Sequence, residues 1–572
     1  MKRLLALAAL ALAVTAAWLL WPRAAPPAGP SIGERVKSSR APAGALSAKV
    51  IPDEDLPPAG TRSLFDHVLA QNDGIRFPFE KLVATIQSYD GSGRAPVAVM
   101  IPSGRSLLKA QASFARPRIA YAADFQAPDT DAELGLAARG ELFVAYVEQA
   151  NELEVISYNE AAGRFEFQLV QDYREGGVPR IVYARRAVCT ACHQGAAPIF
   201  PQRPWSETNG QPAVASRLRA AMSAEHYFGL PAGVPLAAPE RLDELTDVAN
   251  FLPVAQRAWL DGCGEGAPGA ACRRQMLKVA LLYASNPGSF DPGGAEAAAL
   301  RRLQAASWPQ DGIAVPEPDL HNRDPLAESA TWRARLAALL QPSSSRDGAR
   351  SNEDLESFDR LPKLPVDLDP LTPRAPRRVL RASDLDGAFG LAQFLTADDA
   401  RLLERATAGE TARLAQAVAR IPESEFGAAP FSRSRAVNAV LAALKQKPRS
   451  YAFLDTTQMS PPQALGVPPL AIGAESPLRP FEQYCFACHR GNPSARLDFM
   501  SGRDEAEVLE HLKRKAEVRD VLDWTRYGGT DRGSKLMPPA DSRQRALLSA
   551  ALQQDPALLE KMRKVVPAMF DF

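Results

Sequence analysis

The chain has 572 residues, enough for several domains with buried cores. Its 67 lysines and arginines balance 66 aspartates and glutamates, for a net charge of +1. This balance argues against nucleic acid as the main partner, because nucleic-acid-binding proteins usually carry a basic surface. The 49 prolines exceed the usual share of about 5% and indicate long irregular connections between elements.

The N-terminus is typical of an export signal. Met1-Lys2-Arg3 precede a largely apolar run from Leu4 to Trp21. Thr15-Ala16-Ala17 offer small residues for cleavage, yet the run is also just long enough to cross a bilayer, so residues 1–21 are either a removed signal peptide or a membrane anchor. Both alternatives place the bulk of the protein in the periplasm. Residues 22–58 are rich in proline and alanine and are predicted to be a linker.

Six short segments in the next region favour an antiparallel β-meander. They are β-branched or aromatic and are separated by turn residues, and polar and apolar side chains alternate most clearly over Arg164–Leu169. The six segments are Val97–Ile101, Arg118–Ala122, Glu141–Val147, Glu152–Tyr158, Arg164–Val170 and Arg180–Ala184. We place this β-rich domain at residues 59–210.

Helical spacing of apolar residues follows the β-rich region. It predicts helices at Pro239–Phe251, Ala270–Ala284 and Ala295–Ala306, within a helical region at 211–341. Residues 342–380, rich in serine, aspartate and proline, are the expected linker to a last domain at 381–572. There, Thr396 and Asp399 indicate a capping box at the start of a helix that ends before Gly409.

The pattern C-x-x-C-H, the attachment sequence for covalent c-type haem, occurs twice in the chain. The two copies are Cys189-Thr-Ala-Cys192-His193 and Cys485-Phe-Ala-Cys488-His489. On one helical turn these three side chains share a face, so the thiols can reach one porphyrin edge while the imidazole stands under the iron. A pair of zinc half-sites or redox dithiols is the alternative, but no other cysteine and histidine cluster nearby supplies the remaining zinc ligands.

The duplicated motif resembles that of the dihaem c-type cytochromes. The resemblance implies two covalently bound haem c groups. The attachment residues would be Cys189, Cys192, Cys485 and Cys488, with His193 and His489 as iron ligands.

The region after the second motif resembles a class I cytochrome c domain. It contains a helical pattern near Glu505–Ala516, a glycine-rich stretch, Met537 followed by proline, and a last helix from about Asp541. In that family such a methionine supplies the sixth iron ligand, which implies Met537 here and a raised reduction potential suited to electron transfer. Met537 as an ordinary core residue is the alternative. Met500 follows His489 too closely to wrap over a porphyrin.

The β-rich region resembles the cytochromes c-prime-beta in its order of elements, a sheet followed by the haem motif. No residue in a recognisable ligand context marks the sixth position of this first site. The candidates are His226, His321, Met222, Met276 and His67. The alternative is an iron with an open position that binds a small molecule.

Cys263 and Cys272 are the remaining cysteines. In an oxidising compartment a leftover pair is expected to form a disulfide, and we predict one here.

Together these patterns predict an α+β protein: an antiparallel β domain carrying haem 1, a helical middle region, and an all-α cytochrome c-like domain carrying haem 2. The expected function is periplasmic electron transfer with a partner redox protein. The alternatives are a peroxidase- or oxygenase-like enzyme, with an open haem 1 fed by haem 2, and a gas or redox sensor. The dihaem cytochrome c peroxidases have motifs much closer in sequence than Cys189 and Cys485, so none of their catalytic residues is transferred to this chain.

Overall fold

The computed structural model describes residues between 55 and 566, apart from the segments 90–96, 103–111, 124–139, 327–367, 450–455, 466–469, 492–497 and 528–535 and several shorter gaps. No helix among the described residues is long and apolar enough to cross a membrane. The expected signal or anchor at 1–21 and most of the two expected linkers, 22–58 and 342–380, lie outside the described residues.

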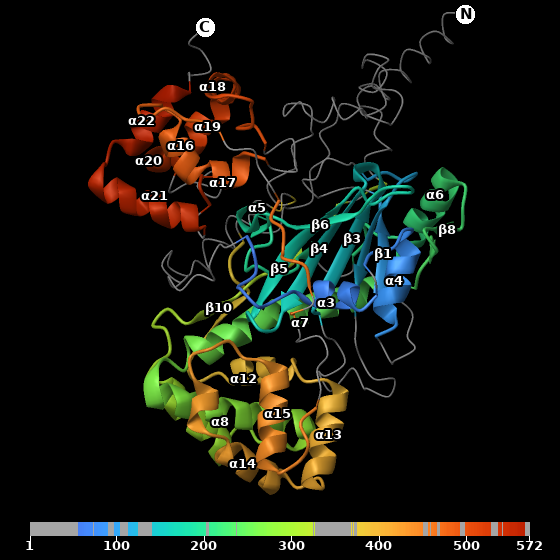
Figure 1. Ribbon diagram of the computed structural model, residues 1–572, viewed down its shortest axis with the longest axis vertical. Helices are drawn as coiled ribbons and strands as arrows, with labels where there is room; N and C mark the ends of the chain where they lie inside the picture. The colour runs from blue at the N-terminus through green and yellow to red at the C-terminus, as the bar shows by residue number, and fades with distance from the viewer. Residues whose placement is uncertain are drawn as a thin grey trace, which may run out of the picture. The chain divides into compact units, whose positions relative to one another are not determined.

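A six-stranded antiparallel sheet occupies the N-terminal half of the described chain (Figure 1). Its strands are β1 (Val97–Ile101), β2 (Arg118–Ala122), β3 (Leu142–Val147), β4 (Glu152–Asn159), β5 (Arg164–Gln171) and β6 (Arg180–Tyr183). Each strand pairs with the next one along the chain, so the predicted meander is confirmed, with boundaries within a residue or so of those expected. The chain is therefore a mixed α+β protein.

The two faces of the sheet have different coverings. One face packs on α3 (Leu64–Ala70) and α4 (Phe79–Gln87), which form a hydrophobic cluster with alternate residues of β1 to β5. The other face is divided. β1 and β2 pack against α7 (Ala237–Leu260), whereas β5 contacts α5 (Arg186–Thr190), which closely follows β6.

The helices after the sheet share one large core. Its members are α7, α8 (Gly266–Ser285), α9 (Ala295–Gln304), α12 (Asp386–Ala392), α13 (Ala397–Thr407), α14 (Thr411–Arg420) and α15 (Arg433–Ala443). The predicted capping box of Thr396 and Asp399 is present. Short elements complete this part: α6 (Pro212–Met222), β7 (Phe200–Pro201) paired with β11 (Asp319–Leu320), and β8 (His226–Tyr227) paired with β9 (Leu230–Pro231).

This packing departs from the domain boundary expected at 342–380. β12 (Arg378–Leu380) returns to pair with β10 (Ile313–Val315), and α12 packs on α7 and α8. Gly387 permits the close approach, because a Cβ there would lie 2.5 Å from that of Ala258. Residues up to Ala443 therefore pack in the same hydrophobic core as the helices that precede residue 342.

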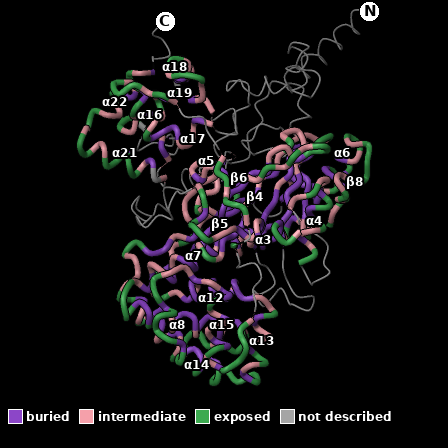
Figure 2. The backbone as a smooth tube through the Cα atoms, in the orientation of Figure 1, coloured by how far each residue is buried: buried purple, intermediate pink, exposed green. Residues whose placement is uncertain are grey.

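A separate, all-helical cluster forms the C-terminal part (Figure 2 shows its buried residues). Its helices are α16 (Arg479–Tyr484), α17 (Phe486–His489), α18 (Glu505–Lys513), α19 (Ala516–Val521), α20 (Trp524–Tyr527), α21 (Arg543–Gln554) and α22 (Leu558–Val565). The predicted helix near 505–516 is two helices, because the chain turns at Arg514 and Lys515.

The predicted disulfide between Cys263 and Cys272 is present and buried, joining the end of α7 to α8. Replacing both cysteines by serine should lower the free energy of unfolding by about 2–3 kcal/mol, because the bond limits the freedom of the unfolded chain. Urea denaturation of the two proteins measures this. Alkylation of the native protein without reductant should label neither residue, and an unchanged urea midpoint would contradict the prediction.

Candidate functional site

A buried ionic network fixes α5, the helix of the first motif, to the sheet. Glu166 on β5 is 1% exposed and accepts hydrogen bonds from Arg186 Nη2 at 2.8 Å and Arg164 Nε at 2.9 Å. Arg186 also donates to the carbonyl oxygen of Phe165, and its backbone N–H donates to Asp55 at the start of the helix. Because a carboxylate so deeply buried must keep its cationic partners, the start of α5 has one position on the sheet.

The first motif forms a tight helical turn at the end of α5. The backbone N–H groups of Cys192 and His193 both donate to the carbonyl oxygen of Cys189, at 3.2 and 2.9 Å. The structure therefore brings together the two thiols and the imidazole that the sequence singled out.

The loop after the motif turns back and holds the imidazole. His193 Nδ1 lies 3.1 Å from the carbonyl oxygen of Ala197, an acceptor that assigns the ring proton to Nδ1 and leaves Nε2 unprotonated. Gly195, at φ +85°, allows this turn, since a Cβ there would lie 2.5 Å from Pro316. Burial lowers the pKa of His193 to about 4, so the imidazole is neutral at neutral pH.

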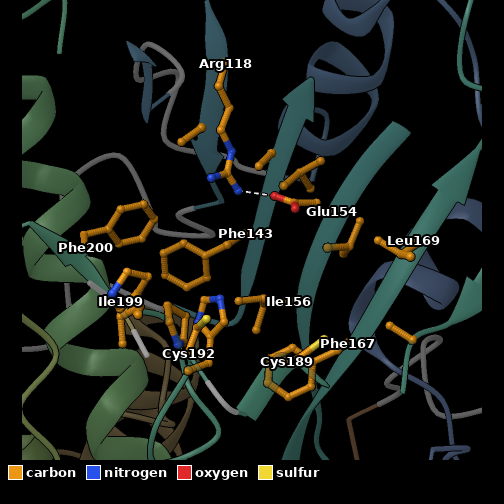
Figure 3. Close-up of a pocket in the computed structure, with 18 of the residues that line it drawn as sticks. Arg118, Phe143, Glu154, Ile156, Phe167, Leu169, Cys189, Cys192, Ile199 and Phe200 are labelled. Atoms are coloured by element: carbon orange, nitrogen blue, oxygen red, sulfur yellow. Dashed lines mark hydrogen bonds and ion pairs between the residues drawn. The ribbon is translucent and has the colours of Figure 1, made fainter. Parts of the chain in front are cut away.

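A cavity of about 210 Å³ lies between the first motif and the face of the sheet on the side of α5 (Figure 3). Cys189, Cys192 and His193 line one side, and the ring of Phe167 lies 5.8 Å from that of His193. The sheet contributes mostly apolar side chains: Ala120, Phe143, Ala145, Ile156, Phe167 and Leu169. A flat, apolar cavity wall opposite two thiols and a neutral imidazole suits a large planar apolar group.

Arg118 and Glu154 interrupt this apolar lining. Arg118 Nη2 donates to Glu154 Oε2, and both side chains line the cavity. Sequence reasoning missed these two residues. The strand pattern places them on the same side of the sheet only once the register is known, and charged residues near strand ends are usually solvent-exposed.

The predicted sixth-ligand candidates of the first site lie elsewhere. Met276 is buried in the helical core, His226 is exposed on β8, and Met222 ends α6. His67 lies on α3, and His321 follows β11. None of the five is among the described residues that line the cavity.

The second motif forms the same kind of turn: Cys485 follows α16, and the other four motif residues form α17. The N–H groups of Cys488 and His489 donate to the carbonyl oxygen of Cys485, at 3.1 and 3.0 Å. Phe499 packs against His489 with ring centroids 4.5 Å apart, and Met500 N–H donates to the His489 carbonyl. Burial raises the pKa of the Cys485 thiol, which is therefore protonated in this state.

The backbone of Met537 is held from two sides. Its N–H donates to the carbonyl oxygen of Val521, and its carbonyl oxygen accepts from Trp524 Nε1, both at 2.9 Å. Arg545 stacks on the Trp524 ring at 3.4 Å and donates to the carbonyl oxygen of Pro538. Trp524 packs against the hydrophobic cluster that contains Cys485, so Met537 is fixed beside the core of the second motif.

The two motif helices touch each other although they are far apart in sequence. Arg185, just before α5, donates to the carbonyl oxygen of Phe486 at 2.6 Å, across 301 residues of chain, and to that of Arg490. Cys488 Sγ lies 3.5 Å from the carbonyl oxygen of Ala187. One arginine, placed just before α5, thus binds the carbonyl oxygen of Phe486 in α17 and that of Arg490 after it.

No group of three or more histidine, cysteine, aspartate or glutamate residues in the described part of the chain is arranged to hold a bare metal ion. No protein family, curated protein or solved structure matches this chain.

We expect Glu166→Ala to lower the free energy of unfolding by about 3–5 kcal/mol, because it leaves two buried guanidinium groups without their carboxylate. The matched control is Glu175→Ala in the exposed turn after β5, which should change stability by no more than about 0.5 kcal/mol. Urea denaturation measures both. A loss below 1 kcal/mol at Glu166 would show that α5 does not depend on this network.

Proposed function

We propose that this protein is a dihaem c-type cytochrome that transfers electrons in the periplasm. The observation that carries the proposal is the environment of His193. Its Nδ1–H is bonded to a backbone carbonyl, which leaves Nε2 for iron, and its ring lies with two cysteine thiols at the edge of an apolar cavity. This donor set and lining fit a haem better than a zinc ion, because the cavity offers no further ligand cluster in the described chain.

The residues that would hold the cofactors are those of the two motifs. Cys189 and Cys192 would bind the first haem through thioether bonds, and Cys485 and Cys488 the second. His193 and His489 would each provide one iron ligand, with Met537 as the sixth ligand of the second iron. A bound haem supplies an iron that changes between the ferrous and ferric states.

Contact between the motif helices supports electron transfer within the chain. Because Arg185 links α5 to α17 and Cys488 lies against Ala187, cofactors attached to the two turns would be near neighbours. An external redox partner protein would then supply or remove electrons at either site.

The lining of the cavity favours a second candidate function, the binding or reaction of a small molecule at the first haem. Its described lining has no histidine or methionine opposite His193 and instead carries the Arg118–Glu154 pair. This supports a haem 1 with room for a small molecule, as in a peroxidase- or oxygenase-like enzyme or a sensor, with haem 2 as its electron source.

Protein matured with a haem-attachment system should show two haem additions by mass spectrometry. The paired replacement Cys189→Ser with Cys192→Ser should remove one addition, and Cys485→Ser with Cys488→Ser the other. Cys263→Ser with Cys272→Ser is the matched control and should retain both. A single addition, or none, in the unmodified protein defeats the proposal.

Met537 ligation predicts a weak near-infrared sulfur-to-iron charge-transfer band. Met537→His should abolish the band and lower the potential of that haem while keeping it low-spin, because imidazole lacks the preference of a thioether for ferrous iron. Trp524→Phe keeps an aromatic ring at this position but removes the hydrogen bond to the Met537 carbonyl, and it should weaken the band. Trp308→Phe, which removes an equivalent bond to the Leu380 carbonyl, should leave it unchanged. Absence of the band in the wild type rejects Met537.

A further inference from the structure

We propose that Arg118 and Glu154 form the recognition pair of a small-molecule site over the first haem, and that its ligand is a small neutral molecule that both accepts and donates a hydrogen bond, such as hydrogen peroxide. The inference rests on the proposed haem at His193 and names the ligand chemistry of that site. The pair supplies complementary groups: the guanidinium can only donate, and the carboxylate accepts.

The strand register places the pair beside the apolar row that faces the motif. Phe143, Ile156 and Phe167 are aligned across β3, β4 and β5, and Phe167 touches His193. Two residues away along the strands, Glu154 is aligned with Ala145 and Leu169 and so projects from the same face. Figure 3 shows Arg118 and Glu154 at one end of the cavity and Cys189 and Cys192 at the other.

Small side chains make room beneath the pair. Ala120 on β2 is aligned with Ala145 on β3, and both line the cavity. Arg118 reaches over this alanine pair from β2 to meet Glu154 on β4. The guanidinium therefore extends across the face of the sheet to β4, and two alanine methyl groups lie in the next row of the cavity lining.

Stability alone does not explain the Arg118–Glu154 pair, because burying two charges carries a desolvation penalty. Both side chains are about four-fifths buried, at 21% and 20% exposed, in a mostly apolar wall. Replacing a buried ion pair by apolar residues of similar volume is often neutral or stabilising. Arg118 Nε is also buried without a hydrogen-bond partner among the described residues, so the guanidinium keeps donor capacity that Glu154 does not use. An unused donor and a carboxylate at one end of a cavity indicate a ligand with an acceptor and a proton.

The test uses the full-length, haem-loaded protein and two probes. Carbon monoxide bound to the reduced protein reports the charge near its oxygen through the C–O stretching frequency. Arg118→Leu should shift that band upward, because a nearby cation is lost. Hydrogen cyanide binds ferric haem as cyanide and gives up its proton, so its nitrogen would accept from Arg118 while the Glu154 carboxylate would take the proton. Its affinity for the oxidised protein should therefore fall about 10- to 100-fold in Arg118→Leu and in Glu154→Gln, the loss expected for one charge-assisted hydrogen bond.

Arg174→Leu is the matched control, since it breaks an exposed Arg–Asp pair in the turn between β5 and β6 and should change neither readout. Arg118→Lys keeps a cation and should shift the C–O band less than Arg118→Leu does. This graded response distinguishes loss of the charge from misfolding of the variant. This inference alone would be overturned if the protein carries two haems but Arg118→Leu changes neither the C–O band nor the cyanide affinity. It would also be overturned if the first haem does not bind carbon monoxide. Fewer than two haem additions would overturn the proposed function instead.

Discussion

The carboxylate of Glu166 is the constraint on which the first site depends. It is buried in the sheet between two guanidinium groups, one from its own strand and one from the first residue of α5. A buried carboxylate cannot give up such partners without a large desolvation cost, so α5 cannot slide or rotate on the sheet. The position of α5 on the sheet therefore sets where the cysteines and His193 lie relative to Phe167 and to the cavity.

The two motifs are alike in sequence and turn geometry, yet their surroundings differ. The first faces a rigid sheet whose strands present flat apolar side chains and one charged pair. The second is wrapped by short helices, with Phe499 against His489 and the Met537 segment braced by Trp524 and Arg545. The described lining of the first cavity has no methionine or histidine opposite His193, whereas the segment that carries Met537 lies beside the core of the second motif. This contrast is the physical basis for proposing an open first haem and a closed second one.

Arg185 connects these surroundings. Its guanidinium donates to the carbonyl oxygen of Phe486, in α17, and to that of Arg490, the residue that follows this helix. The same contact places the second cysteine turn against the base of α5. The proposed electron transfer between the two sites would cross this contact.

The sequence by itself determined the local structure. β-Branched and aromatic segments separated by turn residues specify the six strands and their meander, the capping box specifies the start of α13, and the leftover cysteines specify the disulfide. These features depend on neighbours within a few residues. The tertiary structure decided the rest. That α12 returns to pack on α7, that α5 meets α17, and that Arg118 reaches Glu154 each depend on the register and close packing of segments distant in sequence. Such contacts are selected by the total burial and pairing of the fold, and no local pattern encodes them.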